Sequence, residues 1–222
     1  MTINASATMD RASKLIQDEL HTRWPLVELR QWINDALREL ALRNFSAVSS
    51  PTTMALVKGT RQEIAEPFFR VLRVPRNMRS LTGPRSPGRV ILPVDGKSLD
   101  MTVPDWHDHT RTRPHTIAQN VAFDDAEPRV FYVYPPNDGN GIVEAVGAKV
   151  PDGIPQPTGD VTLLASYSAV LDISDIYTNA ILDYVLYRAY SKDTQFAGSA
   201  ERAALYFGQF EKAVAVGAGS GQ

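Results

Sequence analysis

Apolar residues recur at helical spacing at the start of the chain. Between Met9 and Phe45 they repeat every three or four residues, with a break over residues 21–25. Because this period places apolar side chains on one face of a helix, it predicts two helices joined as a hairpin. Asp10 is expected to cap the first helix. Pro25 is expected in the first turn of the second, where a missing N–H costs nothing.

From about residue 52 to residue 170 the pattern changes to short runs of β-branched and aromatic residues separated by prolines. Such runs predict strands, and no long helix could contain the prolines. Met54–Val57 and Arg61–Ile64 flank Lys58-Gly59-Thr60 and predict a β-hairpin. The other expected strands are Phe68–Val74, Arg89–Leu92, Thr116–Phe123, Val130–Tyr134, Ile142–Val150 and Val161–Leu164. Together they predict a small antiparallel β-sandwich or barrel.

The helical period returns from Ser174. It predicts a helix capped by Ser174 or Asp172, and a last helix from Ala200 to Val216. The predicted fold class is therefore α+β, a helical bundle made from the N- and C-terminal helices with a small antiparallel β module inserted between them. The expected limits are 1–50 for the N-terminal helical hairpin, 51–171 for the β module, 172–216 for the C-terminal helices and 217–222 for a flexible C-terminal extension.

Several aromatic residues follow the period of the last two helices. At this spacing, alternating with Ile and Leu, they are more typical of a helical core than of a surface for base stacking. These residues are Tyr177, Tyr184, Tyr187, Tyr190, Phe207 and Phe210. The helix that starts near Ser174 is apolar around most of its circumference, so it should be buried against several neighbours.

Composition narrows the class of protein. Of the 222 residues, 43% are hydrophobic and 22% charged, which excludes a disordered tail, a collagen-like fibre and a coiled-coil rod. No apolar run is long enough for a bilayer, and the N-terminus lacks a basic start, so we expect no membrane partner and no secretory signal. The absence of cysteine excludes disulfides, thiolate nucleophiles and cysteine zinc sites. The net charge of −2 neither favours nor forbids a nucleic-acid partner.

The most enzyme-like cluster is His107-Asp108-His109, with Asp105 and His115 nearby. Alternating histidines share one face of an extended segment, so one alternative is a metal-dependent hydrolase that uses His107, His109 and His115. Prolines flank the segment, which favours a surface loop instead. No nucleophile elbow, phosphate-binding Gly-rich loop or zinc-protease helix motif occurs. We expect no catalytic residue, metal or cofactor.

A charge asymmetry stands out between Pro67 and Val94. This segment contains no acidic residue and six arginines, which are Arg70, Arg73, Arg76, Arg79, Arg85 and Arg89. Three interpretations remain open. The arginines protect a solvated strand edge, contact a neighbouring subunit, or face a nucleic-acid backbone as in a nonspecific nucleic-acid-binding protein.

A series of short motifs runs through nearly the whole chain in a characteristic order. They are Trp24, Glu28-Leu29-x-x-Trp32-Ile33-Asn34-Asp35-Ala36-x-Arg38-Glu39, Leu56-Val57-x-Gly59-Thr60-Arg61-Gln62, Pro104-Asp105-Trp106-His107, Pro128-Arg129-Val130-Phe131-Tyr132-Val133-Tyr134-Pro135-Pro136, Asp183-Tyr184-Val185-Leu186-Tyr187-Arg188-Ala189-Tyr190-Ser191-Lys192-Asp193 and Phe196-Ala197-Gly198. This series resembles the head-to-tail adaptor (neck or connector) proteins of tailed bacteriophages, of the tail tubular protein A type.

The resemblance implies a structural subunit of the virion neck, present in the host cytoplasm before assembly. Many copies, commonly twelve, would form a ring between the portal protein and a tail tube or nozzle protein. Double-stranded DNA would pass through the ring without sequence specificity. The resemblance also implies that a C-terminal segment docks in the portal, here Val214, Ala215, Val216, Gly217, Ala218, Gly219, Ser220, Gly221 and Gln222. It implies no catalysis.

In such a ring, a dense arginine lining would retain DNA during ejection, because phosphate contacts are strong at low salt. We therefore expect most of the six arginines to face a neighbouring subunit or the tail protein. Their expected partners are carboxylates such as Asp124, Asp125 and Glu127. At most one or two arginines per subunit should reach the channel.

Overall fold

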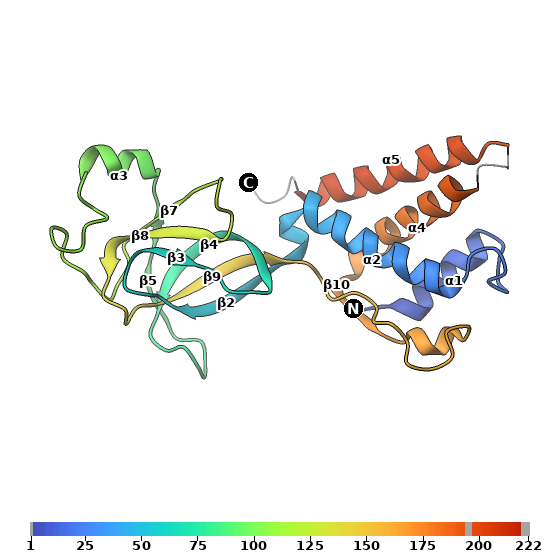
Figure 1. Cartoon of the computed structure of the whole chain (residues 1–222), viewed down its shortest axis with the longest axis horizontal. Helices are drawn as coiled ribbons and strands as arrows, with labels where there is room; N and C mark the ends of the chain where they lie inside the picture. Colours follow the sequence, from blue (N-terminus) through green and yellow to red (C-terminus); the bar gives the residue numbers. More distant parts are fainter. Residues whose placement is uncertain (1, 194–196, 219–222) are drawn as a thin grey trace. The chain divides into compact units, whose positions relative to one another are not determined.

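The computed structural model describes residues 2–193 and 197–218 (Figure 1). The chain divides into two compact units, which we call the helical unit (residues 1–48 and 150–222) and the β unit (residues 49–149). The elements of the helical unit are β1 Thr2–Asn4, α1 Ala5–Leu15, α2 Leu26–Arg43, η1 Phe45–Val48, η2 Leu164–Tyr167, β10 Val170–Ser174, η3 Asp175–Tyr177, α4 Thr178–Lys192 and α5 Ser199–Ala218. Those of the β unit are β2 Ser49–Ala55, β3 Gly59–Glu63, β4 Phe68–Met78, β5 Pro87–Val90, β6 Leu92–Pro93, α3 Gly96–Thr102, β7 Asn120–Phe123, β8 Val130–Asn137 and β9 Ile142–Lys149. The predicted α+β class is confirmed.

Helix α4 packs against α1, α2 and α5, so segments from both ends of the chain form one unit (Figure 1). Its buried positions include the consecutive residues Ala180, Ile181 and Leu182, which lie around much of the circumference. Burial on several sides is what the apolar sequence of α4 predicts. The predicted core aromatics Tyr184 and Phe210 are buried, with ring centroids 5.2 Å apart.

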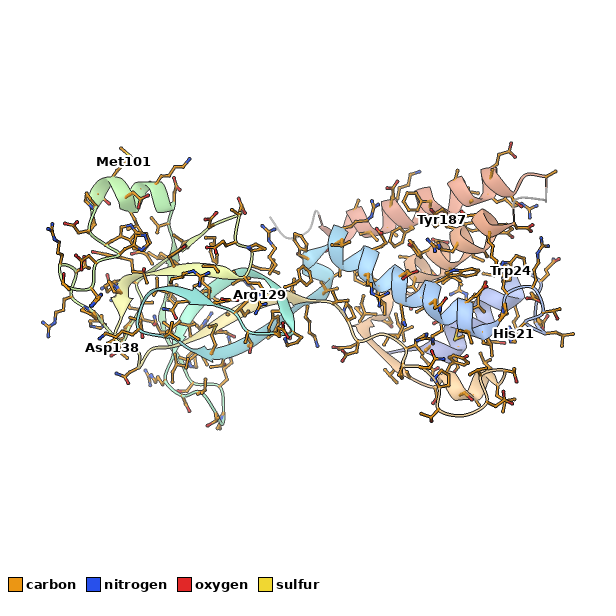
Figure 2. The ribbon with its side chains drawn as sticks, in the orientation of Figure 1. His21, Trp24, Met101, Arg129, Asp138 and Tyr187 are labelled. Carbon is orange, nitrogen blue, oxygen red and sulfur yellow. The ribbon has the colours of Figure 1, made fainter. Side chains whose placement is uncertain are left out.

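The pair formed by Tyr187 on α4 and Phe207 on α5 lies nearer the surface of the helical unit. The ring centroids are 4.8 Å apart, and both residues are half-buried. Figure 2 labels Tyr187. The interface between α4 and α5 is therefore aromatic from its buried positions to its rim.

The starts of the helices differ from the sequence prediction. Asn4, rather than Asp10, caps α1, because pairing of β1 with β10 holds Asn4 in extended geometry before the first turn. Asp10 instead pairs with Lys14 inside the helix. Pro25 lies one position before the first turn of α2, at the cap itself. A turn of 3-10 helix precedes α4 and puts Tyr177 at its cap position, so neither Ser174 nor Asp172 caps it.

The β unit is a sandwich of two sheets. Among the described residues their strand orders are β2-β9-β4-β5 and β3-β8-β7-β6, antiparallel except for the short parallel pair β6–β7. Apolar side chains from both sheets fill the space between them, as alternation along each strand requires. This core consists of Leu56, Ile64, Val71, Val74, Ile91, Ala118, Val121, Phe131, Val133, Val143 and Ala145.

The expected hairpin over residues 54–64 does not form. Its two strands belong to different sheets, since β2 pairs with β9 and β3 pairs with β8. Leu56 is buried in the core between the sheets, which draws the connection inward, and Gly59 provides the positive φ of 106° at the start of β3. Gln62 closes the connection, because its side chain accepts from the N–H of Val57 at 2.7 Å and donates to its carbonyl at 2.9 Å.

The segment from Val150 to Leu171, expected in the β module, is grouped with the helical unit. Asn34 on α2 holds it by accepting from the N–H of Ile154 at 2.7 Å and donating to its carbonyl at 3.1 Å. Arg30 donates to the same carbonyl at 3.0 Å. The expected strand over residues 161–164 is absent from this described segment, and a 3-10 helix begins at Leu164 instead.

Candidate functional site

The six arginines of the segment between Pro67 and Val94 are distributed over one sheet of the β unit. Arg70, Arg73 and Arg76 lie on β4, and Arg89 lies on β5. Arg79 and Arg85 lie in the connection between these strands. The strands and their connection thus carry all six side chains, but the surroundings of these side chains differ.

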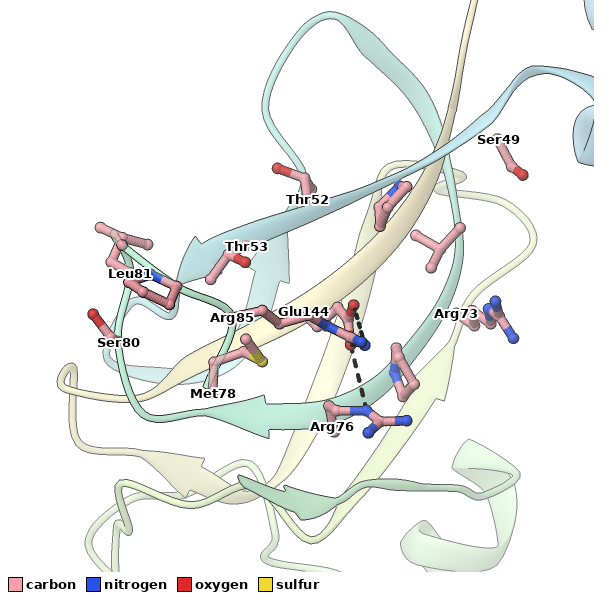
Figure 3. A pocket seen from close by; sticks show the side chains of 15 residues that line it. Ser49, Thr52, Thr53, Arg73, Arg76, Met78, Ser80, Leu81, Arg85 and Glu144 are labelled. Carbon is pink, nitrogen blue, oxygen red and sulfur yellow. Dashed lines mark hydrogen bonds and ion pairs between the residues drawn. The ribbon is translucent and has the colours of Figure 1, made fainter. Parts of the chain in front are cut away.

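A cavity of about 570 Å³ lies over β2, β9 and β4 and is bordered by the connection after β4. Arg73, Arg76 and Arg85 line it together with Glu144 of β9 (Figure 3). Three guanidinium groups and one carboxylate therefore share this space. We call it the arginine cavity.

Glu144 holds two of these arginines. The Glu144 residue is 7% exposed, and Arg85 Nη2 donates to both of its carboxylate oxygens at 2.7 Å. Arg76 Nε lies 3.4 Å from Oε2 of Glu144, which pairs with Arg76 in the strand register (Figure 3). The hydrogen bond with Glu144 raises the pKa of Arg85. A buried carboxylate needs such partners, because desolvation disfavours an isolated charge.

Irregular pairing brings Arg73 and Arg76 to the same cavity. Residues an odd number apart face opposite sides of a regular strand. The register of β4 against β9, however, shifts between Val71 and Arg73 and again between Arg73 and Arg76. Bulges of this kind redirect side chains, so two arginines three positions apart both line the cavity.

The other three arginines lie outside the arginine cavity. Arg70 pairs with Asp125 at 3.1 Å, and the Asp125 side chain is 98% exposed. Arg79 and Arg89 border a second cavity of about 490 Å³ near β5. Within the described part of the chain, the guanidinium groups of Arg73, Arg79 and Arg89 make no hydrogen bond or ion pair.

The expected carboxylate partners Asp124, Asp125 and Glu127 lie in the turn between β7 and β8, which we call the acidic turn (residues 124–127). Asp124 accepts from the N–H of Ala126 at 2.9 Å and so shapes the turn. Glu127 pairs with Arg61 at 3.1 Å, as Asp125 does with Arg70. Two of the three carboxylates thus have an arginine partner in their own chain.

The sequence pattern did not predict a role for Glu144, which pairs with two of the arginines in the arginine cavity. A signal was present, because Glu144 is the one acidic residue in the strand Ile142–Lys149 and lies among apolar residues. A carboxylate inside such a strand requires a cationic partner. The identity of that partner depends on the strand register, which the sequence does not show.

The histidines do not form a metal site. Nδ1 of His107 lies 2.8 Å from Thr60 Oγ1, and its ring centroid is 3.7 Å from that of Trp106. Nδ1 of His115 accepts from the N–H of Ile117, and His109 is exposed. Across residues 2–193 and 197–218, no group of three or more His, Cys, Asp or Glu side chains could hold a metal ion. The geometry therefore does not support the metal-dependent hydrolase alternative.

The expected portal-docking segment begins inside the helical unit. Val214 is buried, and its carbonyl accepts from Asn44 Nδ2 at 3.0 Å. Ala215 is exposed on α5, which continues through Gly217 to Ala218. The helix therefore ends two residues later than expected, and the expected flexible extension does not include Gly217 and Ala218. Residues 219–222 lie outside the described chain.

The chain is a member of a family of phage adaptor proteins. The model of the SU10 adaptor protein family matches residues 3–221, nearly the whole length, so the chain belongs to that family. This membership agrees with the resemblance that the motif order indicates. A comparison with curated proteins gave no match. In the part of the chain that the structure describes, no helix is both long and apolar enough to cross a bilayer.

Proposed function

We propose that the chain is a structural head-to-tail adaptor subunit, copies of which form a ring between portal and tail and continue the DNA channel. The observation that carries this proposal is membership of the SU10 adaptor protein family over residues 3–221. The division into a helical unit and a β unit supports it, because two separate units provide surfaces for two different partners.

In this proposal the helical unit binds the portal protein, and the segment from Val214 to Gln222 extends the contact. The β unit faces the tail tube or nozzle protein and the neighbouring copies. Twelve copies would surround double-stranded DNA without reading its sequence. Pairing of Arg76 and Arg85 with Glu144 supports a role in protein contacts, since it lowers the positive charge available to phosphates. The subunit acts as a scaffold, not as an enzyme, and belongs to the virion neck after assembly in the host cytoplasm.

Phage that lack this chain are expected to accumulate DNA-filled or leaking heads and free tails, with infectious titre reduced by several orders of magnitude. A ring that joins the two parts cannot be replaced by either part alone. The measurement is electron microscopy of lysates from a phage with a stop codon in the gene. The control is the same phage with the chain supplied in trans. Normal tailed particles without the chain would contradict the proposal.

Removal of residues 217–222 is expected to leave the helical unit folded and to weaken portal binding about tenfold. Val214, the last buried side chain described on α5, remains in the shortened chain, so the packing of α5 is kept. Thermal unfolding tests the first part, and sedimentation with purified portal tests the second. Equal portal binding by the full and shortened chains would refute the docking role of this segment.

A further inference from the structure

The arginine cavity has more positive charge than its own chain neutralises. Arg73, Arg76 and Arg85 line it against the single carboxylate of Glu144. Arg85 uses only Nη2 on Glu144, while Arg76 Nε is near Glu144 without a hydrogen bond. The guanidinium group of Arg73 makes no hydrogen bond or ion pair with the described residues. Most guanidinium N–H groups around this space thus remain available for an anionic ligand.

The cavity is arranged before any ligand enters. Glu144 is fixed in β9 and pairs with both Arg85 and Arg76 (Figure 3). Side chains held in this way lose less conformational entropy when a ligand binds. Guanidinium groups bind carboxylates through paired hydrogen bonds, so an incoming acidic side chain suits the site.

The acidic turn provides the complementary group on the same chain. It carries Asp124, Asp125 and Glu127 within four residues, and Asp125 is 98% exposed. Its existing ion pair with Arg70 is solvent-exposed on the Asp125 side, and exposed ion pairs contribute little to stability because water screens them. Asp125 can therefore exchange that partner for guanidinium groups in a more enclosed space.

We propose that the arginine cavity of one copy receives the acidic turn of a second copy, with Asp125 bound by Arg73 and Arg85. This inference rests on the proposed function, in which copies of the chain form a ring. The contact joins two different surfaces, and such a head-to-tail contact generates a closed ring when the rotation between copies closes. Each copy would give its turn to one neighbour and receive the turn of the other.

Cysteine cross-linking tests the contact directly, because the chain has no native cysteine. The test variant carries Ser80→Cys at the cavity and Ala126→Cys in the acidic turn. Oxidation of purified particles is expected to give a ladder of covalent oligomers on a denaturing gel. The single variants should give none, and neither should the control pair Ser80→Cys with Ala165→Cys, whose second position lies on the helical unit.

Charge reversal tests the same contact without a cross-link. Arg73→Glu and Asp125→Arg are each expected to lower incorporation into particles about tenfold, and the double variant should restore it. Arg73 has no ion pair within the described chain to lose, so its replacement should fold normally. The control is Arg113→Glu, an exposed arginine of the β unit outside the cavity, which should have no effect.

The possible results separate this inference from the proposed function. A ladder together with rescue by the double variant supports the inference. If Arg73→Glu lowers incorporation and the added Asp125→Arg does not restore it, the cavity binds a carboxylate of another protein. This result would overturn the role of the second copy. Arg73→Glu particles that assemble normally but leak genome would show that the cavity binds DNA instead. Arg73→Glu particles that assemble normally and stay intact, together with no cross-linked ladder, would overturn the inference. Absence of the wild-type chain from particles would instead overturn the adaptor function itself.

Discussion

Replacement of Asn137 by alanine is expected to destabilise the β unit by about 3–5 kcal/mol. The Asn137 side chain is fully buried at the end of β8. Its Nδ2 donates to the carbonyls of His115 and Thr116, both at 3.1 Å. Its Oδ1 accepts from the N–H groups of Gly139 at 2.9 Å and Gly141 at 3.1 Å. Alanine would leave all four backbone groups without this partner. The bond to Gly141 is buried and the other three are partly buried, and a buried group left unsatisfied costs about 1–3 kcal/mol.

The effect should extend to the arginine cavity, because the turn that Asn137 holds leads directly into β9 and Glu144. Urea unfolding measures the stability change, and hydrogen exchange should become faster over β8 and β9 but not over α4. The matched control is Asn140→Ala, an exposed position in the same turn, which should change stability by no more than about 0.5 kcal/mol. Equal stability of the two variants would show that the amide does not fix the turn.

Residues 137–141 read Asn-Asp-Gly-Asn-Gly, which is typical of a turn, but this composition does not show how tightly the turn is packed. A β-carbon at Gly141 would lie 2.3 Å from Asn137 Nδ2 and 2.6 Å from the carbonyl oxygen of Thr116. Glycine is therefore required at this position by the amide beside it. Turn propensity indicates glycine for its backbone freedom, whereas here the requirement comes from the close approach of the Asn137 amide and of the Thr116 carbonyl, which lies more than twenty residues away in the sequence.

Periodicity predicted the main helices and most strands because it reflects burial, and burial dominates the fold. The boundaries were wrong where a different interaction decided them. Asn4 caps α1 because β1 pairs with β10, and residues 150–171 join the helical unit because Asn34 binds Ile154. These contacts link positions more than a hundred residues apart, so the local propensities of the residues cannot predict them.

The arginine cluster was visible in the sequence, but the cavity that it lines was not. Six arginines without an acidic neighbour left a solvated strand edge, a subunit contact and a nucleic-acid contact open, and their division into separate environments depends on the bulges of β4. The partner of Arg85 is Glu144, which lies on β9 in the middle of the sheet. Sheet order and register make Glu144 the partner within the chain, whereas Asp124, Asp125 and Glu127 stay predicted partners of the arginines across a contact between subunits. The residue types therefore indicated ion pairing by arginine, and the strand order and register determined which carboxylate each arginine contacts.

Replacement of Phe210 by alanine is expected to destabilise the helical unit by about 3–5 kcal/mol and to lower incorporation into particles. Phe210 is fully buried on α5, with its ring centroid 5.2 Å from that of Tyr184 on α4. Alanine would leave a cavity between the two helices. The cost of this cavity adds to the free energy lost because the phenyl ring is no longer buried away from water. The proposed portal-docking segment continues from the same helix, so weaker packing of α5 should also weaken docking.

Leu205→Ala is the matched control for this prediction, because Leu205 lies on the same helix and is 58% exposed. It removes an apolar side chain of similar kind while leaving the interface between α4 and α5 unchanged, so we expect a change of no more than about 0.5 kcal/mol. Urea unfolding gives the stability of each variant, and hydrogen exchange over α4 and α5 locates the loss. A Phe210→Ala chain as stable as Leu205→Ala would mean that the aromatic contacts do not hold α5 in place. A destabilised Phe210→Ala chain that still entered particles at the wild-type level would mean that portal docking does not depend on the packing of α5.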